Sequence, residues 1–203
     1  MIYLLSIGGD IMRTYNSIKN MIFSVISNGL TIIIGFIVQK VFLDMLGTEY
    51  LGINSLYSNI ISMLAIADLE IGTAIIYNLY EPVAHNKKEN IKSLMNFYKK
   101  TYRIISLIIF VIGLLIIPFL GFIVGKTTVP NNELIILFLL FLIDTISSYL
   151  LSYKRSILYA DQKSYVMSII HLGYLVVMNS SLIVALIFTR NFYLYLIIKI
   201  ICR

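Results

Sequence analysis

Five apolar stretches, each long enough to cross a lipid bilayer, occupy most of this chain of 203 residues. A helix rises about 1.5 Å per residue, so about 20 apolar residues cover the roughly 30 Å hydrocarbon core of a membrane. The stretches cover residues 21–43, 51–77, 104–124, 134–153 and 165–188, and a sixth begins near Phe192. Because 59% of the residues are hydrophobic and only 13% are charged, a soluble domain is excluded. The sequence predicts an all-α fold, a polytopic transmembrane helix bundle with five full spans and a truncated sixth.

The basic residues between these spans alternate in number along the chain. Eleven Lys and Arg residues lie before the first span or in the second and fourth connections, whereas three lie in or beside the other connections. Basic residues gather on the cytoplasmic side of membrane proteins. We therefore expect a multi-pass protein with a cytoplasmic N-terminus, and we interpret the net charge of +6 as a topology signal and not as a nucleic-acid surface.

The predicted domains are a cytoplasmic N-terminal segment, residues 1–19, and a helical bundle, residues 20–203. Residues 1–11 are apolar but have no basic leader or signal cleavage site, whereas Met12 begins a polar, basic lead-in to the first span. We expect Met12 to be the native start, which would place residues 1–11 outside the native protein.

The second connection has apolar residues at helical spacing between Ile91 and Tyr102, with basic residues on the other faces. One interpretation is an amphipathic helix on the inner membrane surface, attracted to anionic lipid. The other is a helical extension of the third span. We favour the interfacial helix.

Four spans carry polar side chains at helical spacing, which a helix surrounded by lipid does not need. These polar stripes comprise Asn20, Ser24, Ser27, Thr31 and Gly35; Ser55, Asn59, Ser62, Glu70, Thr73 and Tyr77; Asp144, Ser148, Ser152 and Arg155; and Ser164, Ser168, His171 and Asn179. Hydrogen bonding between helices explains any single stripe. Four stripes together favour a shared hydrated cavity, because ionisable groups at membrane depth need water or a partner.

Two further features concern the shape of the spans. Asp68 and Glu70 point in nearly opposite directions on one continuous helix, which favours a bend near Gly72 or an early exit into the interface. We expect Asp68 to contact a neighbouring helix or the interface. For Glu70 the functional alternative is a carboxylate that faces the cavity. The third span contains Gly113 and Pro118, which suit close packing and a bend.

The residues offer no catalytic pattern. The single Cys202 excludes an internal disulfide, and no Cys/His cluster has the spacing of a metal site. Residues 121–128 have some letters of a phosphate-binding loop, but Leu120 stands where its first glycine belongs, and the segment ends a membrane span. We expect no enzyme activity, no cofactor and no metal.

Residues 35–37 and three longer segments carry a more specific signal: LGTEYLGINSLY at 46–57, MLAIADLEIGTAI at 63–75 and LYADQKSY at 158–165. From about Met12 to its end, the chain resembles the N-terminal half of Wzx-type bacterial polysaccharide flippases. These belong to the multidrug/oligosaccharidyl-lipid/polysaccharide exporter superfamily.

The resemblance implies two helical bundles around a cavity that opens to alternate sides of the bacterial plasma (inner) membrane. It implies transport of an oligosaccharide carried on undecaprenyl pyrophosphate, with basic side chains attracting the diphosphate and a membrane carboxylate serving ion coupling. The expected partners are this lipid-linked oligosaccharide, membrane lipids and polysaccharide assembly proteins. The alternatives are a drug or cation exporter of the same superfamily and a membrane scaffold subunit that transports nothing.

Three departures from the family pattern accompany the resemblance. Gln39 stands where the family usually has arginine, and Lys40 beside it projects about 100° away. Glu70 stands where the family usually has glycine, and family members carry a second helical bundle. We therefore expect a truncated transporter, with Lys40, Glu70, Asp144 and His171 as candidate residues of the substrate pathway.

Overall fold

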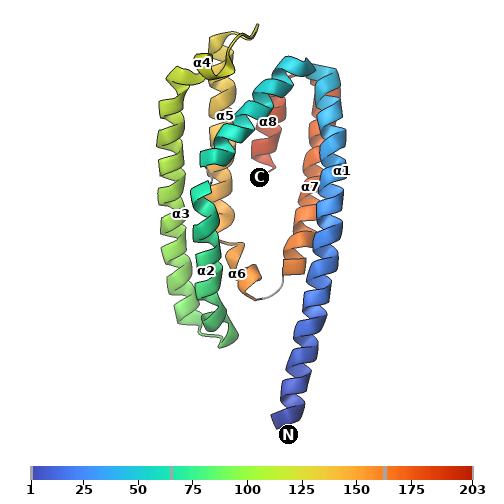
Figure 1. The fold of residues 1–203 in the computed structure, drawn as a ribbon, viewed down its shortest axis with the longest axis vertical. Helices are drawn as coiled ribbons and strands as arrows, with labels where there is room; N and C mark the ends of the chain where they lie inside the picture. Colours follow the sequence, from blue (N-terminus) through green and yellow to red (C-terminus); the bar gives the residue numbers. More distant parts are fainter. Residues whose placement is uncertain (1, 65, 162–163, 203) are drawn as a thin grey trace.

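The computed structural model describes residues 2–64, 66–161 and 164–202, with the side chains of residues 2–17, 19–20, 66–70 and 164–165 left out. All the regular structure of these residues is helical (Figure 1). The helices are α1 (Ile2–Leu64), α2 (Ile66–Ala84), α3 (Lys88–Ile116), η1 (Ile117–Phe119), α4 (Leu120–Val124), α5 (Asn131–Ser152), α6 (Ser156–Ala160), α7 (Ser164–Thr189) and α8 (Phe192–Ile201). The predicted all-α class is therefore confirmed for the described residues.

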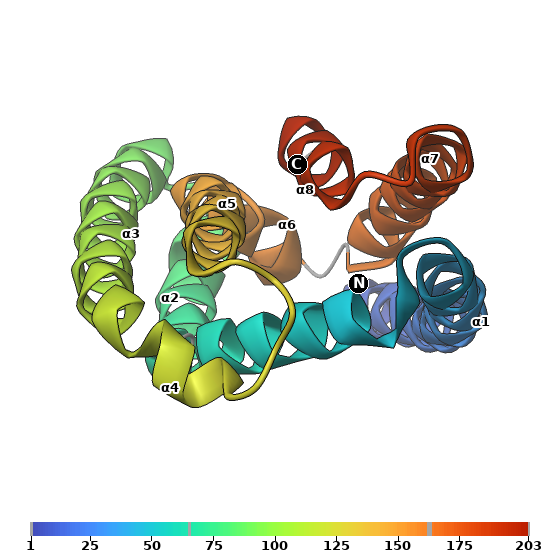
Figure 2. The same cartoon turned by 90° about the horizontal axis from the view of Figure 1, so that it is seen from above.

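Helix α1 consists of two helical segments that meet at a kink. Gly47 has a φ of 86° and a ψ of 176°. Glycine adopts this positive φ readily, whereas a residue with a side chain would be strained there. The segment after Gly47 crosses from the side of the molecule where α7 lies to the side where α2 lies (Figure 2). The connection expected at residues 44–50 therefore contains a change of chain direction, although the chain stays nearly helical through it.

The second expected span does not form one straight helix. Residues 51–77 are shared between α1, which ends at Leu64, and α2, which begins at Ile66 and continues through Gly72, so the helix changes before the glycine near which a bend was expected. The alternative of an early exit into the interface stays a prediction. Four helical segments of the described residues are long and apolar enough to cross a membrane. The side chains of α2 are described only from Ile71 on, so the second span expected at residues 51–77 stays a prediction. The four segments are Met21–Leu64, Lys88–Val124, Asn131–Ser152 and Val166–Thr189.

The second connection joins the third span as one continuous helix. Helix α3 runs without interruption from Lys88 to Ile116, and its residues Tyr98 and Tyr102 are buried. The favoured prediction of a separate interfacial helix is therefore wrong, and the helical extension matches the structure. The bend expected at Pro118 is confirmed, because α3 gives way there to the short 3₁₀ turn η1.

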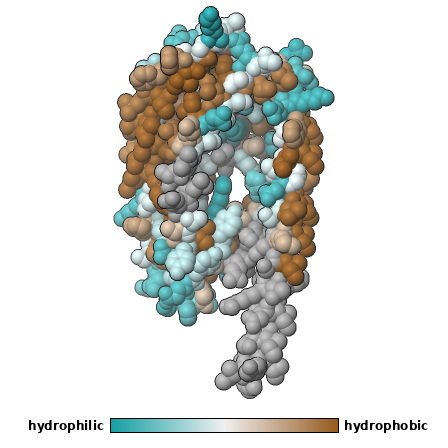
Figure 3. Space-filling model, in the orientation of Figure 1, coloured by the Kyte–Doolittle hydropathy of each residue, from teal (hydrophilic) through white to brown (hydrophobic). Residues whose placement is uncertain are grey.

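Helix α5 packs against α3, α8 and α1, and it is the most buried of the four long apolar segments. Leu137, Phe138 and Leu142 on this helix are completely buried. The hydroxyl of Tyr57 donates a hydrogen bond of 3.0 Å to the carbonyl oxygen of Leu134 and so ties the second part of α1 to α5. The outer surface of the upper part of α3 is a hydrophobic face (Figure 3), and this part of the helix includes the exposed side chains of Leu107, Val111 and Leu115. A face of this kind is the surface that a membrane protein presents to lipid.

The close packing expected of Gly113 is present, and it gives a first prediction. A Cβ atom added to Gly113 would lie 2.4 Å from Cδ2 of the buried Leu142 on α5. We expect Gly113→Ala to lower the free energy of unfolding by about 1–3 kcal/mol, because the leucine must move in a filled core. Unfolding in bicelles, followed by circular dichroism, measures this change.

Gly173→Ala is the matched control for this variant. It lies on α7, and an added Cβ there meets nothing within 4 Å. We expect the control to be neutral or slightly stabilising, since alanine favours a helix. Equal effects of the two variants would contradict the packing of α3 on α5.

Candidate functional site

Two groups of helices frame the interior of the molecule. Seen from above, the first part of α1 lies beside α7, while α2, α3 and α5 form the other side (Figure 2). The connection from α5 through α6 to α7 joins the two groups near the end of the molecule where α2 meets α3 (Figure 1).

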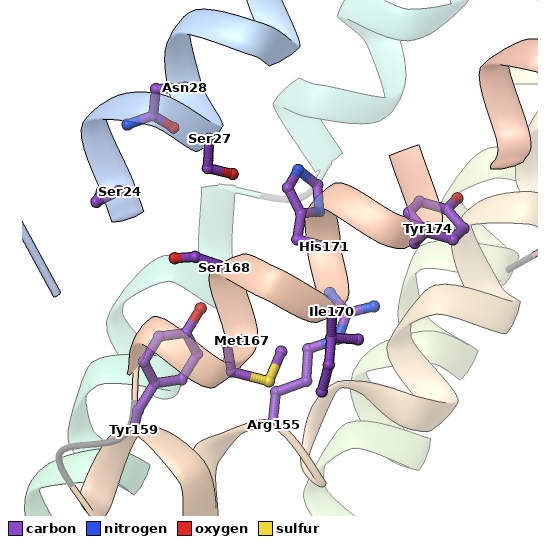
Figure 4. A pocket seen from close by; sticks show the side chains of 10 residues that line it. All are labelled: Ser24, Ser27, Asn28, Arg155, Tyr159, Met167, Ser168, Ile170, His171 and Tyr174. Carbon is purple, nitrogen blue, oxygen red and sulfur yellow. The ribbon is translucent and has the colours of Figure 1, made fainter. Parts of the chain in front are cut away.

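A pocket of about 510 Å³ lies where α1, α6 and α7 meet, and we call it the cationic pocket. Helix α1 contributes Ser24, Ser27 and Asn28, the α6 region contributes Arg155 and Tyr159, and α7 contributes Met167, Ser168, Ile170, His171 and Tyr174. Ser27 of α1 and His171 of α7 point toward one another in Figure 4, whereas Tyr174 lies to one side, and its hydroxyl donates 2.8 Å to Sδ of Met178.

The lining of the cationic pocket favours an anion. Arg155 carries a permanent positive charge with five N–H donors, and the pocket also has serine and tyrosine hydroxyls. None of the described lining residues is acidic. The rings of His171 and Tyr174 lie 6.3 Å apart, on the same face of α7. A phosphate or diphosphate group matches this donor-rich arrangement.

The structure brings parts of three predicted polar stripes together in this pocket. Ser24 and Ser27 of the first stripe meet Ser168 and His171 of the last, and Arg155 comes from the stripe on the fourth span. Tyr159 and Tyr174 were missed, because neither belongs to a stripe. Their place in the pocket depends on how α6 and α7 pack, and the spacing of residues in a sequence does not give that packing.

Asp144 lies at the contact between α5 and α8, and it lines neither of the two pockets described in this section. Its side chain is 7% exposed, and its Oδ2 atom lies 3.3 Å from Nζ of Lys199 on α8. The same ammonium lies 5.3 Å from the ring centroid of Phe141. The partner expected for Asp144 at membrane depth is thus a cation of α8, a lysine that no predicted polar stripe contains.

The other two candidate residues have different outcomes. Lys40 is exposed and is not among the lining residues of the two pockets, whereas its neighbour Gln39 lines the second pocket. The side chain of Glu70 lies outside the described residues, so its prediction as a cavity carboxylate stays a prediction. The described part of the chain has no group of three or more His, Cys, Asp or Glu residues that would hold a metal ion.

The second pocket, of about 410 Å³, lies higher in the bundle, and we call it the neutral pocket. It is lined by Gly35, Val38, Gln39 and Phe42 before the kink of α1, by Leu51, Asn54, Ser55, Ser58 and Asn59 after it, by Asn179 of α7 and by Tyr195 of α8. Its polar groups are amides and hydroxyls, and none of these described residues is charged.

Comparisons with known proteins identify no relative. A scan against protein-family models finds no matching family, and searches of curated proteins and of solved structures find no match.

Proposed function

We propose that this chain is a helical bundle of a membrane transporter, and that the cationic pocket holds an anionic group of its substrate. The observation that carries this proposal is a pocket with Arg155 and several hydroxyls, bordered by α1 and α7, both of membrane-spanning length. A lipid-facing surface does not need such a lining, and a hydrated path for a polar substrate does. The apolar outer face of α3 supports the membrane setting.

More specifically, we propose a lobe of a Wzx-type flippase in the bacterial plasma membrane. In this proposal the helices make five spans, with the end of α1 and α2 forming the second, and the N-terminus is cytoplasmic. The substrate is an oligosaccharide on undecaprenyl pyrophosphate. Arg155 belongs to the fourth connection, which the positive-inside rule places on the cytoplasmic side, where a diphosphate of the inner leaflet would enter.

The alternatives have less support from the pocket. An exporter of cations needs acidic side chains along its path, and the cationic pocket has none among its described residues. A scaffold subunit that moves nothing does not account for a polar pocket at its helix interface. The resemblance of the sequence to the Wzx-type family supports the flippase over these alternatives.

The test is binding of undecaprenyl pyrophosphate by the chain in phosphatidylcholine nanodiscs, measured by native mass spectrometry. We expect Arg155→Gln to weaken binding by about 10- to 100-fold, the effect of losing a charge-assisted hydrogen bond of about 1.5–3 kcal/mol. Inorganic pyrophosphate should compete with the lipid for the same site.

Arg103→Gln is the control for this experiment. Arg103 is an exposed residue of the second connection, on the same expected side of the membrane but outside the described lining of the cationic pocket. We expect this variant to bind the lipid as the unchanged chain does. The proposal would be contradicted if both arginine variants lost the same affinity, because the attraction would then be only to surface charge.

A further inference from the structure

The neutral pocket differs from the cationic pocket in its chemistry. Both pockets are bordered by α1 and α7, but the neutral pocket has no basic or acidic residue among its described lining. It offers the side-chain amides of Gln39, Asn54, Asn59 and Asn179 and the hydroxyls of Ser55, Ser58 and Tyr195. Each amide supplies two N–H donors and an acceptor oxygen, so the wall can bond a ligand that both donates and accepts.

Several of these polar groups have no bond inside the described part of the chain. Among the amides of the pocket, that of Asn179 is satisfied by its own helix, because it donates 2.7 Å to the carbonyl of Leu175, just as Asn78 on α2 donates 2.9 Å to that of Ala74. The described side-chain hydrogen bonds include none from Gln39, Asn54 or Asn59. Lipid offers an amide no hydrogen bond, so groups of this kind at a membrane helix call for water or a polar ligand.

The shape of the pocket results from the kink at Gly47. Because the chain turns there, Gln39 and Phe42 before the kink and Asn54 and Asn59 after it line the same space. Tyr195 closes the pocket from α8, and its ring packs edge-on against Phe42 at a centroid distance of 5.2 Å. The volume of about 410 Å³ falls within the roughly 300–1,000 Å³ of small-molecule sites.

We propose that the neutral pocket binds an uncharged sugar unit and discriminates against acidic sugars. A neutral sugar presents hydroxyls that donate and accept, and these match the amides and hydroxyls of the wall. A uronic acid would bring a carboxylate with no cation to receive it, and its desolvation would be uncompensated. This assignment rests on the proposed function, because the glycan is the part of the proposed lipid-linked substrate that carries uncharged hydroxyl groups.

The experiment compares two soluble trisaccharides, neutral maltotriose and acidic trigalacturonate, by saturation-transfer NMR on the whole chain in phosphatidylcholine nanodiscs. We expect maltotriose to bind and trigalacturonate to bind at least about tenfold more weakly. The double variant Gln39→Leu/Asn59→Leu should weaken maltotriose binding by about tenfold. Pyrophosphate binding should not change in that variant, because neither residue lines the cationic pocket.

Two controls keep the result interpretable. Asn78→Leu removes an amide that lies on α2 and outside the described lining of either pocket, and it should leave maltotriose binding unchanged. If the double variant loses helix content, the milder Asn59→Ser should still weaken binding. A repeat in phosphatidylglycerol nanodiscs tests whether a glycerol headgroup is the occupant, since that headgroup would then displace maltotriose.

Each outcome bears on the proposal directly. Absence of maltotriose binding, equal binding of the acidic trisaccharide, or displacement by phosphatidylglycerol would overturn it. Pyrophosphate binding that depends on Arg155 would meanwhile stand, so failure of the sugar site is distinguishable from failure of the proposed transporter function. Selective maltotriose binding that the double variant weakens would support it.

Discussion

Lys199→Met should destabilise the bundle by about 3–5 kcal/mol, because it leaves the carboxylate of Asp144 buried without its cation. The two side chains are 23% and 7% exposed, and their charged atoms lie 3.3 Å apart between α8 and α5. Attraction between such charges is strong in a medium of low dielectric constant, and so is the cost of leaving one alone. The free energy of unfolding in bicelles, followed by circular dichroism, measures the loss.

The decisive control is the double variant Asp144→Asn/Lys199→Met. Removing both charges also removes the unpaired carboxylate, so we expect the double variant to recover most of the lost stability. Lys99→Met, on the exposed side of α3, should change stability by no more than about 0.5 kcal/mol. A double variant as unstable as Lys199→Met would refute the ion pair as the source of the effect.

Phe42→Ala should cost about 3–5 kcal/mol, the usual loss for a large aromatic side chain removed from a core. Phe42 is 1% exposed, and its ring centroid lies 5.2 Å from those of Phe192 and Tyr195 on α8. The edge-on geometry of both contacts is the favoured one for aromatic rings. Since this cluster joins α1 to α8, its loss should also loosen α8, which hydrogen exchange of the α8 amides would detect.

Phe36→Ala is the matched control on the same helix. Its side chain is 70% exposed, so its removal leaves no internal cavity, and we expect a change within about 0.5 kcal/mol. Comparable losses at the two positions would show that Phe42 does not occupy a packed core.

The sequence was sufficient to predict the elements that depend on local chemistry. Apolar stretches of membrane length predicted helices, and the described residues are helical. Residues 44–50 were expected to turn the chain, and Gly47 permits the backbone conformation that does so. Pro118 was expected to bend the third span, because it cannot donate a helical hydrogen bond, and the 3₁₀ turn occurs there.

The sequence was insufficient wherever the outcome depends on contacts between distant segments. The polar stripe predicted on the second span requires one continuous helix from Ser55 to Tyr77. In the structure α1 ends at Leu64 and α2 begins at Ile66. Helical spacing therefore could not say which polar groups share a face across that boundary. Helical periodicity could not identify the partner of Asp144 either, because Lys199 reaches it only through the packing of α8 on α5.

The proposed function depends on an aqueous cationic pocket inside a bundle that is surrounded by lipid. Cysteine labelling in nanodiscs tests this most directly, in a Cys202→Ser background, with Ser24→Cys and Ser168→Cys in the pocket and Val25→Cys and Val177→Cys on apolar surfaces that are 66% and 64% exposed. A charged methanethiosulfonate reagent should modify the two pocket cysteines and leave the two valine positions unmodified, although Val25 lies next to Ser24. Protection of both pocket cysteines, or equal labelling of all four positions, would contradict the account.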